Sequence, residues 1–210
     1  MQPTLRRDLR LIAITDSLHD GVDGLTQRAR SAVEGGVTMI LLRLNGESAN
    51  TLVEAARALR AGLPAVPLVV TSRIDVALAA GAAGAYLAVD DISPAACRRI
   101  VPAGFLIGAS VGNDDDVLRA AAADFVGIGP VFGATNATED GAALGPERFG
   151  ELARRCKVPA VAIGGVRADN IRAVMDAGAS GVASISAVFG SAKPSFSARV
   201  LRDSQDASEM

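Results

Sequence analysis

Short apolar runs alternate with segments of helical spacing along the whole chain. The runs are found at residues 9–15, 37–42, 67–70, 85–88, 105–109, 124–129, 159–163 and 181–185. Runs that are this short and this uniformly apolar are typical of parallel strands buried on both faces. The sequence therefore predicts a parallel sheet whose strands are joined by helices.

A helical segment follows each apolar run. Ser48 and the pair Ser93-Pro94 are typical of helix starts, and Gly35-Gly36 and Gly81 are typical of helix ends. The segments lie at residues 25–34, from 48, 73–80, from 93, 114–122, 146–156, 168–177 and 188–202, the last interrupted near Pro194. The charged first ten residues are expected to lead directly into the first strand, and the polar tail at residues 203–210 is expected to fray.

Eight strand–helix pairs in a chain of 210 residues match the count of a (β/α)₈ barrel. The alternative is a doubly wound open sheet, which usually carries a G-x-G-x-x-G fingerprint after its first strand. No such fingerprint follows the first run here, and no linker or low-complexity stretch divides the chain. We therefore predict the α/β class, with a single (β/α)₈ (TIM) barrel domain over residues 1–210.

Composition limits the partners of this barrel. Hydrophobic residues make up 50% of the chain and aromatic residues only 3%, so aliphatic side chains are expected to fill the core. The net charge of -2 gives no indication of nucleic-acid binding. No apolar run reaches the roughly 20 residues of a membrane span, and the charged start lacks the apolar region of a signal peptide. We expect a cytoplasmic protein without nucleic-acid or membrane partners, and a homo-oligomer is left open.

The active site of such a barrel lies at the carboxyl ends of its strands. The residues at these ends are Thr15, Asp16, Arg43, Thr71, Ser72, Asp90, Asp91, Ser110, residues 129–132, Gly164, Gly165 and residues 184–186. At Gly164-Gly165 and at Ser184, Ser186 and Ala187, small or absent side chains let backbone N–H groups approach a ligand, and strand ends that open onto helices bind anions. A small phosphorylated substrate is therefore expected here; the alternative is that the glycines only permit tight turns.

Several stretches at these positions resemble the thiamine phosphate synthase family and its relative, the thiazole tautomerase family. They are LIAITD, AVEGGVTMILLR, LVVTSRIDVALAAGAAGAYLAVDD, IGASV, ADFVGIGPVF, VPAVAIGGV and GASGVASISAVF, in the family's order over residues 11–189. The resemblance implies a (β/α)₈ barrel. It also implies one of two activities. A synthase joins a pyrimidine pyrophosphate to a thiazole phosphate with Mg²⁺ and releases pyrophosphate, whereas a tautomerase aromatises the thiazole phosphate.

The resemblance also implies roles for individual residues. Arg43 and Ser110 would contact pyrophosphate, Asp91 would bind Mg²⁺, and Gly164, Gly165, Ile185 and Ser186 would hold the thiazole phosphate. Arg43 has an alternative role as the partner of a nearby carboxylate such as Asp16. The pair Asp90-Asp91 has an alternative role as a solvated loop before the helix that starts at Ser93.

The chain departs from the family pattern at several strand ends. A lysine two residues after the arginine is replaced by Asn45, an Asn-Asp pair by Thr71-Ser72, and a histidine by Tyr86. The loop after the sixth strand lacks the family's lysine and reads Ala134, Thr135, Asn136 and Ala137, and the histidine of the tautomerases is Gly112. This loop, residues 133–144, is expected to act as a lid.

These replacements matter because a departing pyrophosphate needs fixed positive charge in the transition state. Three functions therefore stay open. The first is a thiamine phosphate synthase that uses Mg²⁺. The second is a tautomerase-like isomerase with one phosphorylated ligand and no metal. The third is a non-catalytic protein that binds a small phosphorylated ligand.

Overall fold

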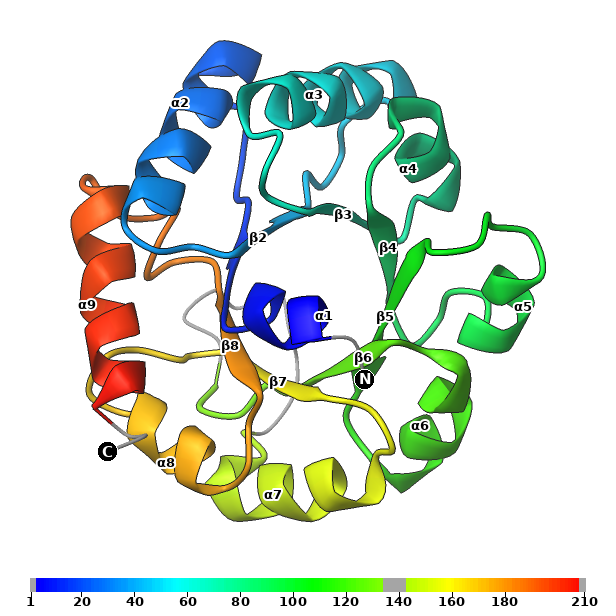
Figure 1. Cartoon of the computed structure of the whole chain (residues 1–210), viewed down its shortest axis with the longest axis vertical. Helices are drawn as coiled ribbons and strands as arrows, with labels where there is room; N and C mark the ends of the chain where they lie inside the picture. Colours follow the sequence, from blue (N-terminus) through cyan, green and yellow to red (C-terminus); the bar gives the residue numbers. More distant parts are fainter. Residues whose placement is uncertain (1–2, 134–142, 208–210) are drawn as a thin grey trace.

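The computed structural model describes residues 3–133 and 143–207. Within these residues, eight parallel strands close into a barrel in the order of the sequence, and helices surround it (Figure 1). The strands are β1 (Leu11–Ile14), β2 (Met39–Leu42), β3 (Leu68–Thr71), β4 (Gly84–Leu87), β5 (Leu106–Val111), β6 (Phe125–Ile128), β7 (Ala160–Ile163) and β8 (Gly181–Ser184). Leu11 of β1 lies opposite Val182 of β8, so the sheet has no open edge. The predicted (β/α)₈ barrel is confirmed.

The helices begin where the sequence places capping residues. Ser48 and Ser93 each accept a hydrogen bond from a backbone N–H one turn later, and Gly81 ends α4 with a φ of 63°. The helices are α1 (Pro3–Asp8), α2 (Gly21–Glu34), α3 (Ala49–Gly62), α4 (Ile74–Ala80), α5 (Pro94–Arg98), α6 (Asp114–Arg119), the 3₁₀ turn η1 (Ala120–Ala122), α7 (Gly145–Arg155), α8 (Ile171–Asp176) and α9 (Pro194–Asp206). In the described part of the chain, none of these helices has the length and apolar character of a membrane span.

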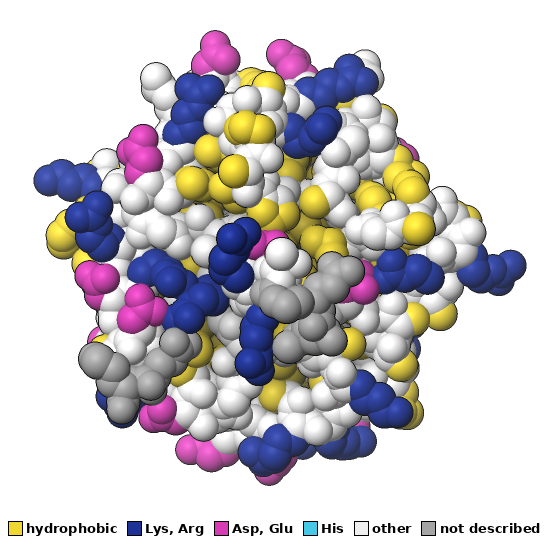
Figure 2. Space-filling model, viewed as in Figure 1, with side chains coloured by type: hydrophobic (Ala, Val, Ile, Leu, Met, Phe, Trp, Pro, Cys, Tyr) yellow, Lys and Arg dark blue, Asp and Glu magenta, His cyan; other side chains and the backbone are white. Residues whose placement is uncertain are grey.

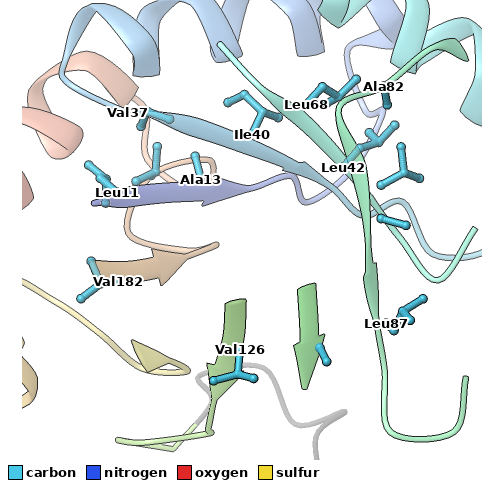
Figure 3. Packing of buried hydrophobic residues seen from close by; sticks show 14 of the residues in the cluster. Leu11, Ala13, Val37, Ile40, Leu42, Leu68, Ala82, Leu87, Val126 and Val182 are labelled. Atoms are coloured by element: carbon cyan, nitrogen blue, oxygen red, sulfur yellow. The ribbon is translucent and has the colours of Figure 1, made fainter. Parts of the chain in front are cut away.

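The strands divide the core into two layers. Ile12 and Ile14 belong to the cluster inside the barrel, whereas Leu11 and Ala13 belong to the cluster between the barrel and the helices. Figure 3 shows this outer layer, with side chains such as Leu11 and Val182 pointing from the strands toward the helices. Each large side chain that is fully buried in this way stabilises the fold by about 1.5–3 kcal/mol. The uniformly apolar runs of the sequence are explained by burial on both faces of every strand.

The amino-terminal end of the barrel is covered by a helix that the sequence analysis did not predict. Helix α1 crosses this end of the barrel (Figure 1), and its Leu5 packs against the inner cluster. The expectation that the first ten residues lead directly into a strand is therefore wrong. Helix α1 has six residues, and Leu5 is the one that packs against the inner cluster. A helix this short shows no helical period in the sequence.

The carboxyl terminus is also more regular than predicted. Helix α9 begins at Pro194 and continues through Asp206, so the prediction of a frayed tail is wrong for residues 203–206. Gln205 is fully buried and its Nε2 donates to the carbonyl oxygen of Arg10 over 2.7 Å. A guanidinium nitrogen of Arg10 lies 2.6 Å from a carboxylate oxygen of Asp206. These long-range contacts hold the last turn, and residues 208–210 lie outside the described part.

Candidate functional site

The carboxyl ends of the strands surround a cavity of about 640 Å³, which is a typical size for a small-molecule site. Of the seven residues to which the family resemblance gives a role, six line it: Arg43, Ser110, Gly164, Gly165, Ile185 and Ser186. A second cavity, of about 690 Å³, lies beside α1 at the opposite end of the barrel, on the face where Lys and Arg side chains gather in Figure 2. We take the first cavity as the candidate active site, because barrels of this class place their chemistry at the carboxyl ends of the strands.

Gly164 and Gly165 form half of a group that we call the β7–β8 cradle, which also contains Ile185 and Ser186. Both glycines have positive φ angles, 90° and 65°. The carbonyl oxygen of Gly164 accepts a hydrogen bond from the N–H of Phe132 over 3.1 Å. In a trans peptide the C=O and the following N–H point in opposite directions, so the N–H of Gly165 points away from Phe132. Among the described residues, no acceptor bonds this N–H.

Ile185 and Ser186 form the other half of the cradle. The carbonyl oxygen of Ile185 accepts hydrogen bonds from the N–H groups of Val188 and Phe189, over 3.2 and 2.8 Å. The N–H of Ser186 belongs to the same peptide plane and therefore points away from this turn. No acceptor within the described chain takes it, and Ser186 is exposed at the cavity. The cradle thus offers two N–H donors from neighbouring strand ends, an arrangement suited to an anion.

Side chains dominate the opposite wall, which we call the β2–β5 arc and which comprises Arg43, Thr71, Tyr86, Asp90 and Ser110. Thr15, which is fully buried, holds the backbone of Arg43: its Oγ1 donates to the carbonyl oxygen over 2.8 Å and accepts from the N–H over 2.9 Å. Asp16, the alternative partner for Arg43, pairs instead with Arg28 over 2.7 Å.

Tyr86 and Ser110 are joined at the floor of the cavity. Ser110 Oγ donates to Tyr86 Oη over 3.1 Å, and Tyr86 Oη donates to the carbonyl oxygen of Gly127 over 3.5 Å. A Cβ atom at Gly127 would collide with this hydroxyl, and one at Gly108 would collide with the ring. Two glycines therefore make room for a tyrosine where the family pattern has a histidine. The sequence analysis recorded this replacement but did not predict its bond to Ser110.

The two aspartates after β4 have different surroundings. Asp90 lines the cavity, whereas Oδ2 of Asp91 accepts the N–H of Ala88 over 2.7 Å, and Asp91 is not among the described lining residues. No group of three or more potential metal-ligating side chains occurs in the described ranges. Mg²⁺ is commonly held by one or two carboxylates together with substrate phosphates, so Asp90 and its neighbour fit this ion. The assignment of Mg²⁺ to Asp91 stays a prediction.

Thr71, at the end of β3, has a buried hydroxyl that the sequence could not reveal. Thr71 lines the cavity, and its Oγ1 is buried without a hydrogen-bond partner in the described structure. The next residue, Ser72, has a φ of 60°, which is strained for a residue other than glycine. An unpaired buried hydroxyl costs free energy unless a ligand satisfies it. Thr71, one of the strand-end residues selected from the sequence, is therefore a further candidate contact.

The loop that was expected to act as a lid lies largely outside the described residues. Of residues 133–144, those from 134 to 142 lie outside the described residues, and with them the replacements from Ala134 to Ala137. The two ends of the loop are described. The N–H of Val131 donates to the carbonyl oxygen of Ile163 over 2.9 Å, and the N–H of Leu144 donates to that of Pro130 over 2.9 Å. The lid stays a prediction.

The closed barrel and its mouth cavity define the class of (β/α)₈-barrel proteins with a site at the carboxyl ends of the strands. Comparison with known proteins is more specific. The family model described as "Thiamine monophosphate synthase" matches residues 11–188. The chain belongs to this family.

Individual relatives agree with this assignment. The chain is 38% identical to a thiamine-phosphate synthase of Azorhizobium caulinodans, over 93% of this chain and 94% of that one. It is 43% identical to a thiamine-phosphate synthase of Methanoculleus marisnigri, over 85% and 86% of the two chains. The solved structure of a thiamine phosphate pyrophosphorylase from Pyrococcus furiosus superposes with a TM-score of 0.87 and 33% identity, over 97% and 98% of the two chains.

Proposed function

We propose that this protein is a thiamine-phosphate synthase, which joins a pyrimidine pyrophosphate to a thiazole phosphate and releases pyrophosphate. The observation that carries the proposal is one cavity with two unlike walls. The β7–β8 cradle presents backbone donors, and the β2–β5 arc presents a guanidinium, hydroxyls and a carboxylate. Two substrates that each carry a phosphate group can be bound face to face in such a cavity. Family membership and the names of the relatives support the same activity.

In this proposal the cradle binds the phosphate of the thiazole substrate. The N–H groups of Gly165 and Ser186 donate to its oxygens, and the partial positive charge of these donors favours a doubly charged group. Arg43 and Ser110 on the arc hold the pyrophosphate of the other substrate, and the planar guanidinium suits bidentate contact with phosphate oxygens. The hydroxyl of Thr71 supplies one further donor from the same wall.

Catalysis then comes largely from placement. The bond between a carbon of the pyrimidine substrate and a pyrophosphate oxygen breaks, and its electron pair leaves with pyrophosphate. The lone pair of the thiazole ring nitrogen then forms the new bond to the same carbon. Holding the two partners in one cavity makes this encounter intramolecular, which lowers the barrier by as much as about 7–11 kcal/mol in favourable cases. Arg43 stabilises the negative charge that develops on the leaving group.

Mg²⁺ belongs to this proposal as the resident cofactor, with Asp90 and Asp91 as its protein ligands. When bound, it would neutralise part of the pyrophosphate charge. Asp90 supplies a carboxylate at the cavity wall, and the bond from Ala88 to Asp91 fixes the loop that carries both residues. A cytoplasmic location is also proposed, because charged phosphorylated substrates do not cross an apolar membrane core unaided.

The replacements at Asn45 and Thr71-Ser72 set an expectation for the rate. Among the described residues that line the cavity, Arg43 provides the positive charge. Loss of one fixed donor to a developing charge costs about 10²–10³-fold in rate. We therefore propose a slow synthase whose affinity for the thiazole phosphate is less affected than its turnover.

The test is to mix the purified protein with the pyrimidine pyrophosphate, the thiazole phosphate and Mg²⁺ and to measure pyrophosphate release and the coupled product. Release that requires both organic substrates supports the proposal. Calorimetric binding of the thiazole phosphate without release would reject it in favour of a non-catalytic binding protein. Aromatisation of a thiazole precursor without coupling would favour the tautomerase-like function instead.

A further inference from the structure

The β7–β8 cradle is supported from outside the cavity by a residue that belongs to no proposed contact. Helix α2 carries Arg28, whose side chain is only 14% exposed. Arg28 lies far from the cradle in the sequence. Its guanidinium nevertheless contacts the turn that contains Ile185 and Ser186, and this contact suggests a positioning role.

One side of the Arg28 guanidinium is held by the loop between β1 and α2. It lies 2.7 Å from a carboxylate oxygen of Asp16 and donates twice to the carboxylate of Asp20, over 2.9 and 3.0 Å. It also donates to the carbonyl oxygen of Ser17 over 2.9 Å. Burial alone would lower the pKa of Arg28, but the hydrogen bonds to Asp16 and Asp20 outweigh burial and raise this pKa. The guanidinium therefore has one orientation and stays charged.

The same guanidinium also lies over an aromatic ring. The central carbon of Arg28 lies 5.6 Å from the centre of the Phe189 ring, which is within the range of a cation–π contact. Phe189 is 3% exposed and follows β8 in the chain. Because Arg28 is hydrogen-bonded to the loop after β1, the contact links this loop to the turn after β8. Strands β1 and β8 are neighbours in the closed barrel.

Phe189 in turn fixes a peptide plane of the cradle. Its N–H donates to the carbonyl oxygen of Ile185 over 2.8 Å, and that carbonyl shares a plane with the N–H of Ser186. A rotation of this plane would turn the Ser186 donor away from the cavity. The chain of contacts therefore runs from Arg28 to Phe189, from Phe189 to Ile185, and from Ile185 to the N–H of Ser186.

We infer that Arg28 is a positioning residue of the anion site, which acts through Phe189 to aim the Ser186 N–H at a bound phosphate. All three of its nitrogens donate hydrogen bonds while its central carbon lies over the Phe189 ring, so lysine cannot replace it despite the same charge. The inference predicts a specific defect: weaker binding of the ligand held by the cradle, with little change in the ligand held by the arc. The choice of thiazole phosphate as probe rests on the proposed function.

The experiment compares Arg28→Lys, Phe189→Leu and a control, Arg30→Lys, by calorimetry with thiazole phosphate and by thermal unfolding. Arg30 lies on the same helix, and among the described residues its side chain donates one long hydrogen bond, 3.4 Å, to the carbonyl oxygen of Gly62. We expect Kd for thiazole phosphate to rise about tenfold in Arg28→Lys and in Phe189→Leu, because small displacements of positioned groups have effects of this order or larger. Arg30→Lys should stay within about twofold of the wild-type protein.

Steady-state kinetics distinguish a positioning residue from one that only stabilises the fold, because general destabilisation would not change one KM selectively. In Phe189→Leu, KM for thiazole phosphate should rise while KM for the pyrimidine pyrophosphate stays within about twofold. If Arg28→Lys does not fold, Phe189→Leu alone tests the inference. Equal changes in both KM values, or an unchanged Kd in a folded variant, overturn the inference while an active wild-type protein keeps the proposed function. If the wild-type protein binds thiazole phosphate without turnover, the proposed function fails and the Kd ratios still decide the inference. If it binds neither thiazole phosphate nor inorganic phosphate, both fail.

Discussion

The two walls of the cavity use different kinds of groups. The β7–β8 cradle uses backbone N–H groups that are aimed by turns, and it keeps the glycines and the serine that the family resemblance leads one to expect. The β2–β5 arc uses side chains, and the replacements at Thr71-Ser72 and Tyr86 are concentrated there. The comparison shows that a backbone site depends on a few positions with special φ angles, whereas a side-chain site can change one residue at a time.

The largest effect is expected for Gly165→Ala in the cradle. Gly165 has a φ of 65°, and an added Cβ would collide with the carbonyl oxygen of Gly133. A positive φ alone costs alanine about 1–2 kcal/mol, and relief of the collision requires the cradle to move. Calorimetry should show thiazole phosphate affinity reduced by about 10²-fold, the scale reached by misplaced binding groups.

Gly104→Ala is the matched control for this variant. Gly104 has a φ of 83° and nothing within 4 Å of an added Cβ, and it lies before β5, at the other end of the barrel. It should lose about 1 kcal/mol of stability in denaturant unfolding and keep its ligand affinity. Equal affinities in both alanine variants would contradict the assignment of the cradle.

Arg43→Lys should have the next largest effect, on the other wall. The ammonium keeps the charge but loses bidentate geometry, so kcat/KM for the pyrimidine pyrophosphate should fall by about 10²-fold. The affinity for thiazole phosphate should change less than about twofold, because the cradle is left intact. Arg57→Lys, on the exposed surface of α3, is the control. A similar loss for both substrates would show that the two walls do not bind separately.

Asp90→Asn tests which aspartate serves a metal ion. We expect the Mg²⁺ concentration for half-maximal activity to rise about tenfold, which is at the low end of the cost of altering a metal site. Asp91→Asn should act less on Mg²⁺ and more on thermal stability, because the Asp91 carboxylate accepts the N–H of Ala88. Asp115→Asn, on the exposed face of α6, serves as the control. A larger metal effect at Asp91 would favour Asp91 as the main ligand, as predicted from the sequence.

Tyr86→Phe should have a smaller effect. It keeps the ring that fills the space above Gly108 and removes only the hydroxyl that joins Ser110 to the floor of the cavity. One hydrogen bond contributes about 0.5–1.5 kcal/mol, so kcat/KM should fall by about three- to tenfold. Ser110→Ala should lose more, because Ser110 is also proposed to contact pyrophosphate, and the double variant should lose no more than Ser110→Ala alone. Additive losses would show that the two hydroxyls act independently.

The smallest effect is expected in acid. Burial acts to raise the pKa of Asp20, but the hydrogen bond and charge of Arg28 outweigh it, so this pKa lies below its ordinary value. A lowered carboxyl pKa stabilises the folded protein above the ordinary value of about 4, and this contribution is lost as the pH falls further. Asp20→Asn should therefore flatten the decrease in Tm between about pH 5 and pH 3. An unchanged slope would argue against the Arg28 contact.

Local patterns explain what the sequence could predict. The alternation of short apolar runs with helical segments, together with the helix caps, predicted the barrel. In such a barrel the site lies at the strand ends, and this rule selected Arg43, Ser110 and the cradle. Three features depend on contacts that no local pattern encodes: the covering helix α1, the different surroundings of Asp90 and Asp91, and the contact between Arg28 and Phe189. That the Thr71 hydroxyl has no partner among the described residues likewise depends on the folded structure.

The pairing of β1 with β8 has a consequence for synthesis on the ribosome. The cradle lies on the last two strands, and its support comes from a helix near the beginning of the chain. A nascent polypeptide that has not yet released β8 from the exit tunnel has most of the arc but no cradle. Binding of the ligand held by the cradle can therefore begin only after β8 has left the tunnel, and this ligand would stabilise chains that contain β8 and not shorter ones.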